Sequence, residues 1–326
     1  MVFEYVKEIN SGDFKVYIID DYELRRSQRT GMYVLPEKNN VTLIDTCTSP
    51  SLRYILAGLY KLKIELTHVK NIIVTHIHVD PAGAAGLLMK CCPNAQLFVH
   101  PLGKTHMCEP VKLEKSLKKS YGHDIFNKNF CPIIPIPKAR IHSVADGEKL
   151  EISTNRELQF FYTPGHVNHH MSIYDSAING IFTGDTLGAN FPEIDYNLYL
   201  PITSPPQFDY KKMIESKKRI QKLNPSKIYF GHYGVSGVSQ EVEEVYRQLQ
   251  YWLKIYIDIG KNVCKTENDV NNAINAISKQ IVEKIKYKLI EKGLPLEHPF
   301  YEKIKPDIDF CASGIILYLK RMKFNS

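Results

Sequence analysis

The stretch Thr75-His76-Ile77-His78-Val79-Asp80 decides the fold, because it places two histidines and a carboxylate directly after a short apolar run. Residues 71–75 predict a buried strand, and the small residues of 82–89 predict a helix after it. The chain turns where a strand ends, so these side chains can converge on one point. Imidazole nitrogens and carboxylate oxygens together suit zinc, iron or manganese. One such stretch does not establish a site, because histidine pairs are common on protein surfaces.

Three further motifs repeat the same arrangement of an apolar strand, a glycine-containing turn and one possible ligand. They are Thr163-Pro164-Gly165-His166, Phe182-Thr183-Gly184-Asp185-Thr186 and Tyr229-Phe230-Gly231-His232-Tyr233-Gly234. Glycine lacks a Cβ, so the backbone beside the ligand can approach a metal closely. Each motif alone is more often structural, but core packing does not explain four in succession. Together they predict a metal centre.

The rest of the chain predicts layered α and β structure followed by helices. A helix is predicted from residue 49 to about residue 62, with Ser49 as its N-cap and Pro50 at its first position. After Tyr229 the apolar spacing becomes helical. Further strands are predicted at residues 14–20, 32–35, 41–45, 96–100, 140–144, 158–163, 171–175 and 180–183, and further helices at 240–259, 268–292 and 308–322.

In these motifs and their order, the chain resembles the metallo-β-lactamase superfamily, in particular its glyoxalase-II-like and lactonase-like branch. The resemblance covers roughly residues 14–235 and implies an αββα sandwich with metal at one edge of the paired sheets. It implies that His76, His78 and His166 hold the first metal and that Asp185 bridges to a second one. Asp80 and His232 would complete the second site. The expected cofactor is zinc, one or two ions per chain, with iron or manganese as alternatives.

A narrower resemblance includes a segment of the C-terminal part of the chain. The segments His100-Pro101-Leu102-Gly103, 132–137 and 307–310 are similar to those of a widespread, mostly uncharacterised hydrolase subgroup. The expected division is therefore a metallo-β-lactamase domain over residues 1–238 and a helical extension over 239–326 that packs on it. The alternative is that these helices present a face to a partner, for which a homodimer is one arrangement.

Pro81 departs from the family pattern, which normally has a second histidine directly after the aspartate. Proline has no side-chain ligand, so the second site keeps only Asp80, Asp185 and His232, and it is predicted to be labile. Asp80 also suits the N-cap of a helix that begins at Pro81. Its alternatives are therefore a capping residue only, or a metal ligand and general base.

The predicted function is a metal-dependent hydrolase that uses metal-activated water on an ester, thioester or lactone, with Asp80 as the catalytic residue. Tyr196, Tyr199 and Tyr233 are candidates for binding the substrate, although each also suits ordinary packing. The alternatives are a phosphodiesterase, an oxidoreductase with one iron similar to the persulfide dioxygenases, and a metal-binding protein without turnover.

The charge and the composition of the chain limit the classes of partner that it is expected to bind. The formal charge of +7 is modest, and residues 102–140 carry eight Lys or Arg against three Asp or Glu, a local surplus of five. This segment, or residues 102–135 of it, is expected either to cover the metal edge or to pack as a structural helix.

No apolar run is long enough for a membrane span. Seven scattered cysteines do not indicate a disulfide framework. We expect a cytoplasmic enzyme of a small-molecule substrate, without nucleic acid or membrane partners. The adjacent Cys91 and Cys92 suit a buried helix end better than a metal site.

Overall fold

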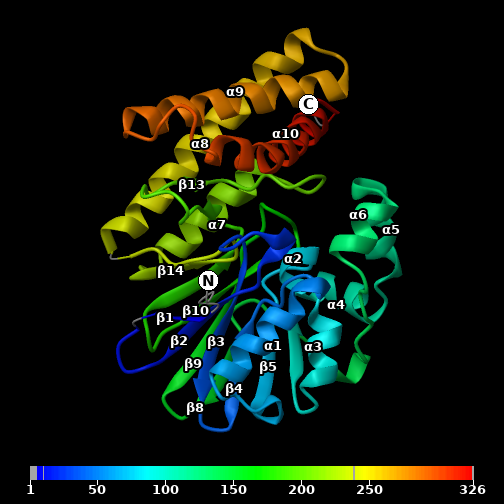
Figure 1. The fold of residues 1–326 in the computed structure, drawn as a ribbon, viewed down its shortest axis with the longest axis vertical. Helices are drawn as coiled ribbons and strands as arrows, with labels where there is room; N and C mark the ends of the chain where they lie inside the picture. Colours follow the sequence, from blue (N-terminus) through cyan, green and yellow to red (C-terminus); the bar gives the residue numbers. More distant parts are fainter. Residues whose placement is uncertain (1–5, 10, 238, 325–326) are drawn as a thin grey trace.

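Two β-sheets stacked face to face, with helices on both outer faces, form the body of the protein in the computed structural model (Figure 1). The structure describes residues 6–9, 11–237 and 239–324. The larger sheet contains, in spatial order, β1 (Val6–Ile9), β2 (Val16–Asp20), β3 (Gly31–Glu37), β4 (Asn40–Ile44), β5 (Val69–Ile73), β6 (Gln96–Val99) and β7 (Ile141–Ser143). The smaller sheet contains β14 (Lys227–Phe230), β11 (Gly180–Gly184), β10 (Met171–Asp175), β9 (Arg156–Tyr162) and β8 (Lys149–Ser153).

The apolar strands are explained by burial on both of their faces. In β3, Tyr33 and Leu35 point into the core between the two sheets, whereas Met32 and Val34 point into the core under the helices. The smaller sheet shows the same alternation, since Tyr229 of β14 packs between the sheets and its neighbours pack outward. Successive side chains of a strand point to opposite faces, so a sheet that is covered twice reads as a continuous apolar run.

The helices on the two outer faces complete four layers. Over the larger sheet lie α1 (Leu52–Lys61) and α3 (Ala85–Cys91), and over the smaller sheet lie α7 (Tyr210–Gln221) and α8 (Ser239–Thr266). This is the αββα sandwich that the sequence predicts. The remaining elements are α2 (Val79–Ala82), α4 (Pro101–Cys108), α5 (Val111–Tyr121), α6 (His123–Asn129), β12 (Ala189–Asn190) and β13 (Tyr199–Leu200), together with four short 3₁₀ helices, Glu23–Arg25, Ser49–Ser51, Leu66–His68 and Lys138–Arg140.

The last helices form one layer above the smaller sheet (Figure 1), where α9 (Val270–Glu291) and α10 (Phe300–Phe324) pack on each other and on α8. A single apolar cluster contains Trp252 of α8, Ile277 of α9 and Ile315 of α10 as well as Phe230 of the smaller sheet. The helices after β14 therefore share their core with the sandwich. None of the described helices is both long and apolar enough to cross a membrane.

Some predicted boundaries were wrong. The helix predicted from residue 49 begins as the 3₁₀ turn Ser49–Ser51, and the residue before that turn is Thr48, so Ser49 is not the N-cap. The single helix predicted at residues 82–89 is divided into α2 and α3. The last helix begins at Phe300 and not at residue 308. Proline usually breaks a helix, so the predicted helix began after Pro306, whereas the observed helix contains Pro306 in its interior.

Replacement of Trp252 tests whether the C-terminal helices and the sandwich unfold as one unit. Trp252 is 1 % exposed and lies in the cluster that joins the helices to the smaller sheet. Its replacement by Ala is expected to lower the free energy of unfolding by about 3–5 kcal/mol, through lost burial and a cavity. Urea unfolding followed by circular dichroism should remain one transition. Tyr60→Ala, at an aromatic side chain that is 86 % exposed, is the control. Separate transitions for the two regions would contradict a shared core.

Candidate metal centre

The predicted ligands meet because four strands end at the same edge of the sandwich. Within the smaller sheet, β9, β11 and β14 run in the same direction, since β10 is antiparallel to both of its neighbours and β11 is parallel to β14. His166, Asp185 and His232 follow these three strands, and His76 follows β5 of the other sheet. The Met171 amide donates a hydrogen bond to the Thr75 carbonyl and so links the two sheets at this edge.

Three imidazoles form the centre of the site. The distance from Nδ1 of His78 is 3.0 Å to Nε2 of His76 and 3.0 Å to Nε2 of His166. Nitrogen ligands at about 2.1 Å from a tetrahedral zinc ion are separated by about 3.4 Å, so the three nitrogens are spaced nearly as such ligands are. Burial lowers the pKa of His76 and of His78 well below its usual range, and both rings are therefore neutral at physiological pH.

The outer nitrogens of two rings are held as donors, which fixes their tautomers. His166 uses Nδ1 on the Ile202 carbonyl at 2.8 Å. His76 uses Nδ1 on the Thr75 hydroxyl at 3.2 Å, and that hydroxyl donates in turn to Asp45. Nε2 of His76 and Nε2 of His166 then carry lone pairs that point toward Nδ1 of His78. A single N–H of His78 can satisfy only one of them, whereas a cation can bind all three nitrogens, so these residues fit a metal ion.

Asp185 lies beside the three imidazoles. Its Oδ2 is 3.3 Å from Nε2 of His166 and 3.7 Å from Nε2 of His76. The preceding Gly184 has a φ of +48°, and a Cβ there would lie 2.6 Å from Nε2 of His170. The same nitrogen of His170 accepts a hydrogen bond from the Asp185 amide at 3.1 Å. His170 is thus buried support for the Asp185 turn and contributes no ligand.

A second cluster contains Asp80, Asp185 and His232. Nε2 of His232 is 3.5 Å from Asp80 Oδ2 and 3.9 Å from Asp185 Oδ2. Burial lowers the pKa of His232, but Asp185 and Asp80 outweigh it and raise the pKa to about 9. Burial raises the pKa of Asp80, but its hydrogen bond with His232 helps to lower it to about 2. The two side chains therefore form an ion pair here.

Pro81 stands at the position where the family pattern has a second histidine. It lines a small cavity together with Asp80, Asp185 and His76, and its carbonyl accepts hydrogen bonds from Thr46. Asp80 does not cap the helix: α2 begins at Val79 and its N-cap position is that of His78. The histidine nearest in sequence to the third ligand, His169, stacks on the ring of His76 at 6.3 Å and does not belong to the second cluster.

The C-terminal helix α10 supports the loop that orients His166. The Thr203 hydroxyl donates to the Cys311 carbonyl at 2.8 Å, and Ile202, the neighbour of Thr203, provides the carbonyl that holds His166. A Cβ on Gly314 would lie 1.9 Å from the Thr203 carbonyl oxygen, so α10 approaches this loop more closely than any other residue would permit. Residues far apart in the sequence thus position one imidazole.

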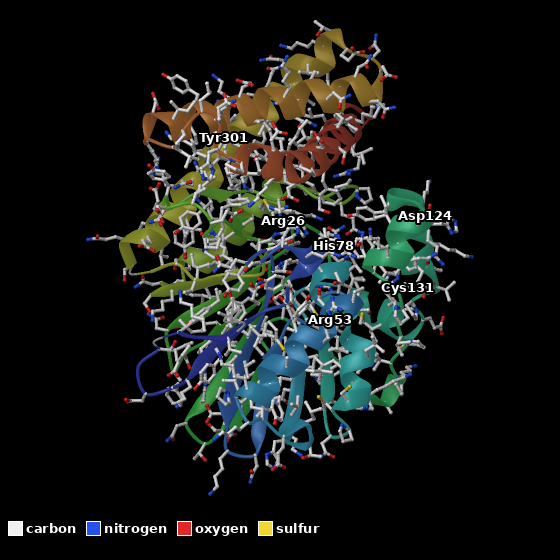
Figure 2. The ribbon with its side chains drawn as sticks, viewed as in Figure 1. Arg26, Arg53, His78, Asp124, Cys131 and Tyr301 are labelled. Atoms are coloured by element: carbon white, nitrogen blue, oxygen red, sulfur yellow. The ribbon has the colours of Figure 1, made fainter. Side chains whose placement is uncertain are left out.

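The site opens on a cavity of about 760 Å³. Its inner wall carries His78, Asp80 and His166. In Figure 2, the labelled His78 lies between Arg26 and the helix that carries Asp124, below α10. One wall belongs to residues 102–135, which contain α5, α6 and most of α4, and Leu117 of this segment packs in one apolar cluster with Val79 beside the ligands. That segment thus lies at the metal edge of the molecule and not on the opposite face.

The structure does not bring the three candidate tyrosines to this cavity. Tyr199 is 2 % exposed and stacks on Phe230, Tyr233 is buried between the sheets, and Tyr196 packs against the cluster of the C-terminal helices. None of them lines the large cavity. Their positions after ligand turns in the sequence suggested that they bind substrate, but in the structure their side chains pack in the core or against it.

Sequence reasoning also missed Asp45 and His170, which hold the ligands from behind. Asp45 follows β4 and accepts hydrogen bonds from both the amide and the hydroxyl of Thr75. An aspartate directly after an apolar strand was a signal for it. The seven cysteines are free thiols, and Cys92 is buried at the end of α3, as the sequence predicts.

The metallo-beta-lactamase superfamily is the family to which this chain belongs, because the model of that family matches residues 28–232. A metallo-beta-lactamase fold-containing protein of Sulfurisphaera tokodaii is 31% identical over 201 residues, which are 60% of this chain and 72% of that protein. A beta-lactamase-like protein 2 homolog of Caenorhabditis elegans is 23% identical and covers 85% of this chain and 84% of its own. The crystal structure of a metallo-beta-lactamase family protein of Thermus thermophilus superposes with a TM-score of 0.62 at 16% identity, over 99% of this chain and 95% of that one.

Metal content after gentle chelation is the first test of the site. Wild-type protein is expected to keep about one equivalent of zinc and to lose a second, because only the cluster of His76, His78 and His166 has three imidazoles. Pro81→His should keep two equivalents, since it restores an imidazole at the family's position. Elemental analysis after dialysis measures both.

The variants His166→Ala and His232→Ala assign the metal that remains. The first should lose the tightly held ion and the second should keep it. A wild-type protein that retains two equivalents as firmly as Pro81→His would overturn the prediction, as would a tight ion that depends on His232 and not on His166.

The contact of α10 with the loop at Thr203 leads to a second prediction. Gly314→Val should displace that loop and lower zinc affinity by about 10–100-fold, a magnitude typical of lost support for a ligand. Thr203→Val, which removes only the hydroxyl bonded to Cys311, should have a smaller effect in the same direction. Competition with a fluorescent chelator measures the affinity. Lys320→Val places the same side chain on an exposed part of α10 and should change nothing; equal affinities in all variants would refute the role of α10.

Proposed function

We propose that this protein is a metal-dependent hydrolase that acts on an ester, a thioester or a lactone. One observation carries the proposal: the buried cluster of three imidazoles and a carboxylate opens, with Asp80 beside it, on a large and mostly apolar cavity. Membership of the superfamily supports metal-dependent hydrolysis in general. The cavity volume of about 760 Å³ is in the range that drug-sized ligands occupy, which favours a small molecule over a polymer.

When bound at the three imidazoles, a divalent metal supplies Lewis acidity and lowers the pKa of water. The chain contributes the remaining functions. Asp80 lies on the cavity wall beside His78, where its carboxylate can orient a water molecule and accept a proton from it. His232 holds the Asp80 carboxylate through their ion pair at 3.5 Å.

A phosphodiesterase is the second candidate, because the basic segment of the sequence reaches the cavity. Lys112 and Lys119 of α5 lie on its wall. Protein loaded separately with zinc, manganese or ferrous iron and assayed on chromogenic esters, thioesters, lactones and phosphodiesters separates the two. Turnover of the phosphodiester alone would refute the first proposal, and turnover restricted to the iron form with uptake of oxygen would indicate an oxidoreductase.

The role of Asp80 is tested by Asp80→Asn. Loss of a general base is expected to lower kcat by about 10²–10⁴-fold, while the tightly held metal stays at one equivalent because the three imidazoles remain. Steady-state kinetics with the best substrate of the panel, together with elemental analysis, measures both quantities. Asp124→Asn, at an exposed carboxylate of α6, is the matched control and should keep full activity. An unchanged kcat in Asp80→Asn would leave Asp80 with no part in proton transfer.

A further inference from the structure

Helix α5, whose Leu117 packs in one apolar cluster with Val79 beside the metal ligands, combines two different surfaces. Lys112, Ser116 and Lys119 are spaced as one row of a helix, and Leu113 and Leu117 form the adjacent row. Both rows line the large cavity. Lys112 and Lys119 are exposed, whereas Leu117 is buried and Leu113 is half-buried. This helix therefore offers a cationic edge and an apolar surface to the same space.

The other cations of the cavity wall are neutralised within the protein. Arg29 donates to both carboxylate oxygens of Asp307 at 2.8 and 2.9 Å and to Glu23 at 2.7 Å. Arg26 is 3.7 Å from the same Asp307. These four side chains balance in charge and connect the 3₁₀ turn Glu23–Arg25 to α10. Their position beside the ligands is thus structural.

Lys112 and Lys119 are not neutralised in this way. Among the described residues, the ion pair on α5 joins Lys118 to Glu114 and involves neither of these two lysines. Glu193 is the carboxylate of the cavity wall that stands outside both the ligand clusters and the Arg29 network. Two lysines against one glutamate leave this side of the cavity positive, and an anionic group would be attracted to it.

The wall formed by α10 supplies apolar surface. Ile308, Phe310 and Leu317 line the cavity, and Leu317 is 37 % exposed although it is fully apolar. Leu24, at 40 % exposed, lies on the wall nearby. Covering such side chains with an acyl chain removes apolar area from water and contributes about 25 cal/mol per Å².

From these two surfaces, we infer that the substrate is an amphipathic anion, in which an apolar acyl chain is joined through an ester or thioester bond to an anionic alcohol or thiol. The acyl chain lies along Leu113, Leu117 and Leu317, and the anionic group meets Lys112 and Lys119. Water attacks the acyl carbon and the bond to oxygen or sulfur breaks. The products are a carboxylate, the anionic alcohol or thiol with one proton, and a second proton that passes through Asp80 to solvent. The inference rests on the hydrolase function proposed above.

Binding tests the inference without turnover. Decyl phosphate, below its micelle concentration, is titrated into zinc-loaded protein by calorimetry, with inorganic phosphate and the neutral decyl glucoside as comparisons. We expect decyl phosphate to bind more tightly than either. The double variant Lys112→Glu/Lys119→Glu should weaken decyl phosphate by about 10-fold or more and decyl glucoside by less than about 2-fold. Lys115→Glu, on the same helix but outside the cavity wall, is the matched control and should bind as wild type does.

The apolar wall has its own variant, Leu317→Asp, which should weaken decyl phosphate and decyl glucoside alike. Leu296→Asp, at an exposed leucine outside the cavity wall, is its control. Inorganic phosphate that binds as tightly as decyl phosphate would overturn the inference, because the metal alone would then explain the affinity. Equal binding by the double-lysine variant and wild type would also overturn it.

Kinetics then separate this inference from the function on which it rests. Decanoyl thioesters of 3-mercaptopropionate, which is anionic, and of N-acetylcysteamine, which is neutral, carry the same acyl chain. The anionic thioester should have a kcat/KM higher by about 10-fold, and the double-lysine variant should remove this preference. If both thioesters are hydrolysed equally, the inference is wrong and the hydrolase function stands. If neither thioester is hydrolysed, and none of the esters and lactones of the panel is, although decyl phosphate binds as expected, the hydrolase function fails and the amphipathic cavity stands.

Discussion

Three imidazole nitrogens that face one another at about 3 Å are the interaction on which the rest of this structure depends. The lone pairs of His76 and His166 cannot both be satisfied by the one ring nitrogen of His78 that they face, so the protein holds the rings in place from behind. It does so with groups from separate parts of the chain: Thr75 and Asp45 behind His76, and the Ile202 carbonyl behind His166. The sandwich provides four strand ends at one edge, and the loops after them bring the rings together. The stability of two sheets and their shared core thus maintains an arrangement that is locally unfavourable.

The C-terminal helices have a direct connection to this arrangement. Helix α10 contacts the loop behind His166 through Gly314, forms one wall of the cavity, and holds Arg29 through Asp307. A helical segment that only covered the smaller sheet would not need a glycine against a backbone carbonyl at this point. The chain after β14 therefore shapes the space in front of the ligands as well as the core behind them, and the same scaffold with a different last helix would have a different cavity.

The sequence pattern predicted layered α and β structure and a metal centre with His76, His166 and Asp185, because a possible ligand follows an apolar strand in each motif; the αββα sandwich was implied by the family resemblance. It failed where tertiary packing decides. Tyr199 and Tyr233 follow ligand turns in the sequence, but both side chains are buried in the core. His170 was missed although it lies four residues after His166, and its Nε2 accepts a hydrogen bond from the Asp185 amide. The start of α10 was missed because Pro306 is tolerated within a helix whose other residues are well packed. Asp45 left a signal as an aspartate directly after an apolar strand, but its support of His76 through Thr75 is evident only in the structure.

The second cluster shows how one substitution changes the balance between a metal and a proton. With a histidine at position 81, two imidazoles and two carboxylates would favour a second cation. With Pro81, the remaining imidazole is His232, which lies between Asp80 and Asp185. Two carboxylates beside one imidazole attract a proton to it, as its pKa of about 9 indicates. A protonated His232 neutralises part of the charge that a second metal would otherwise neutralise, and it does so without the ligand that the chain lacks. Within the cluster, Asp80 is thus paired with His232 and lies on the wall of the cavity.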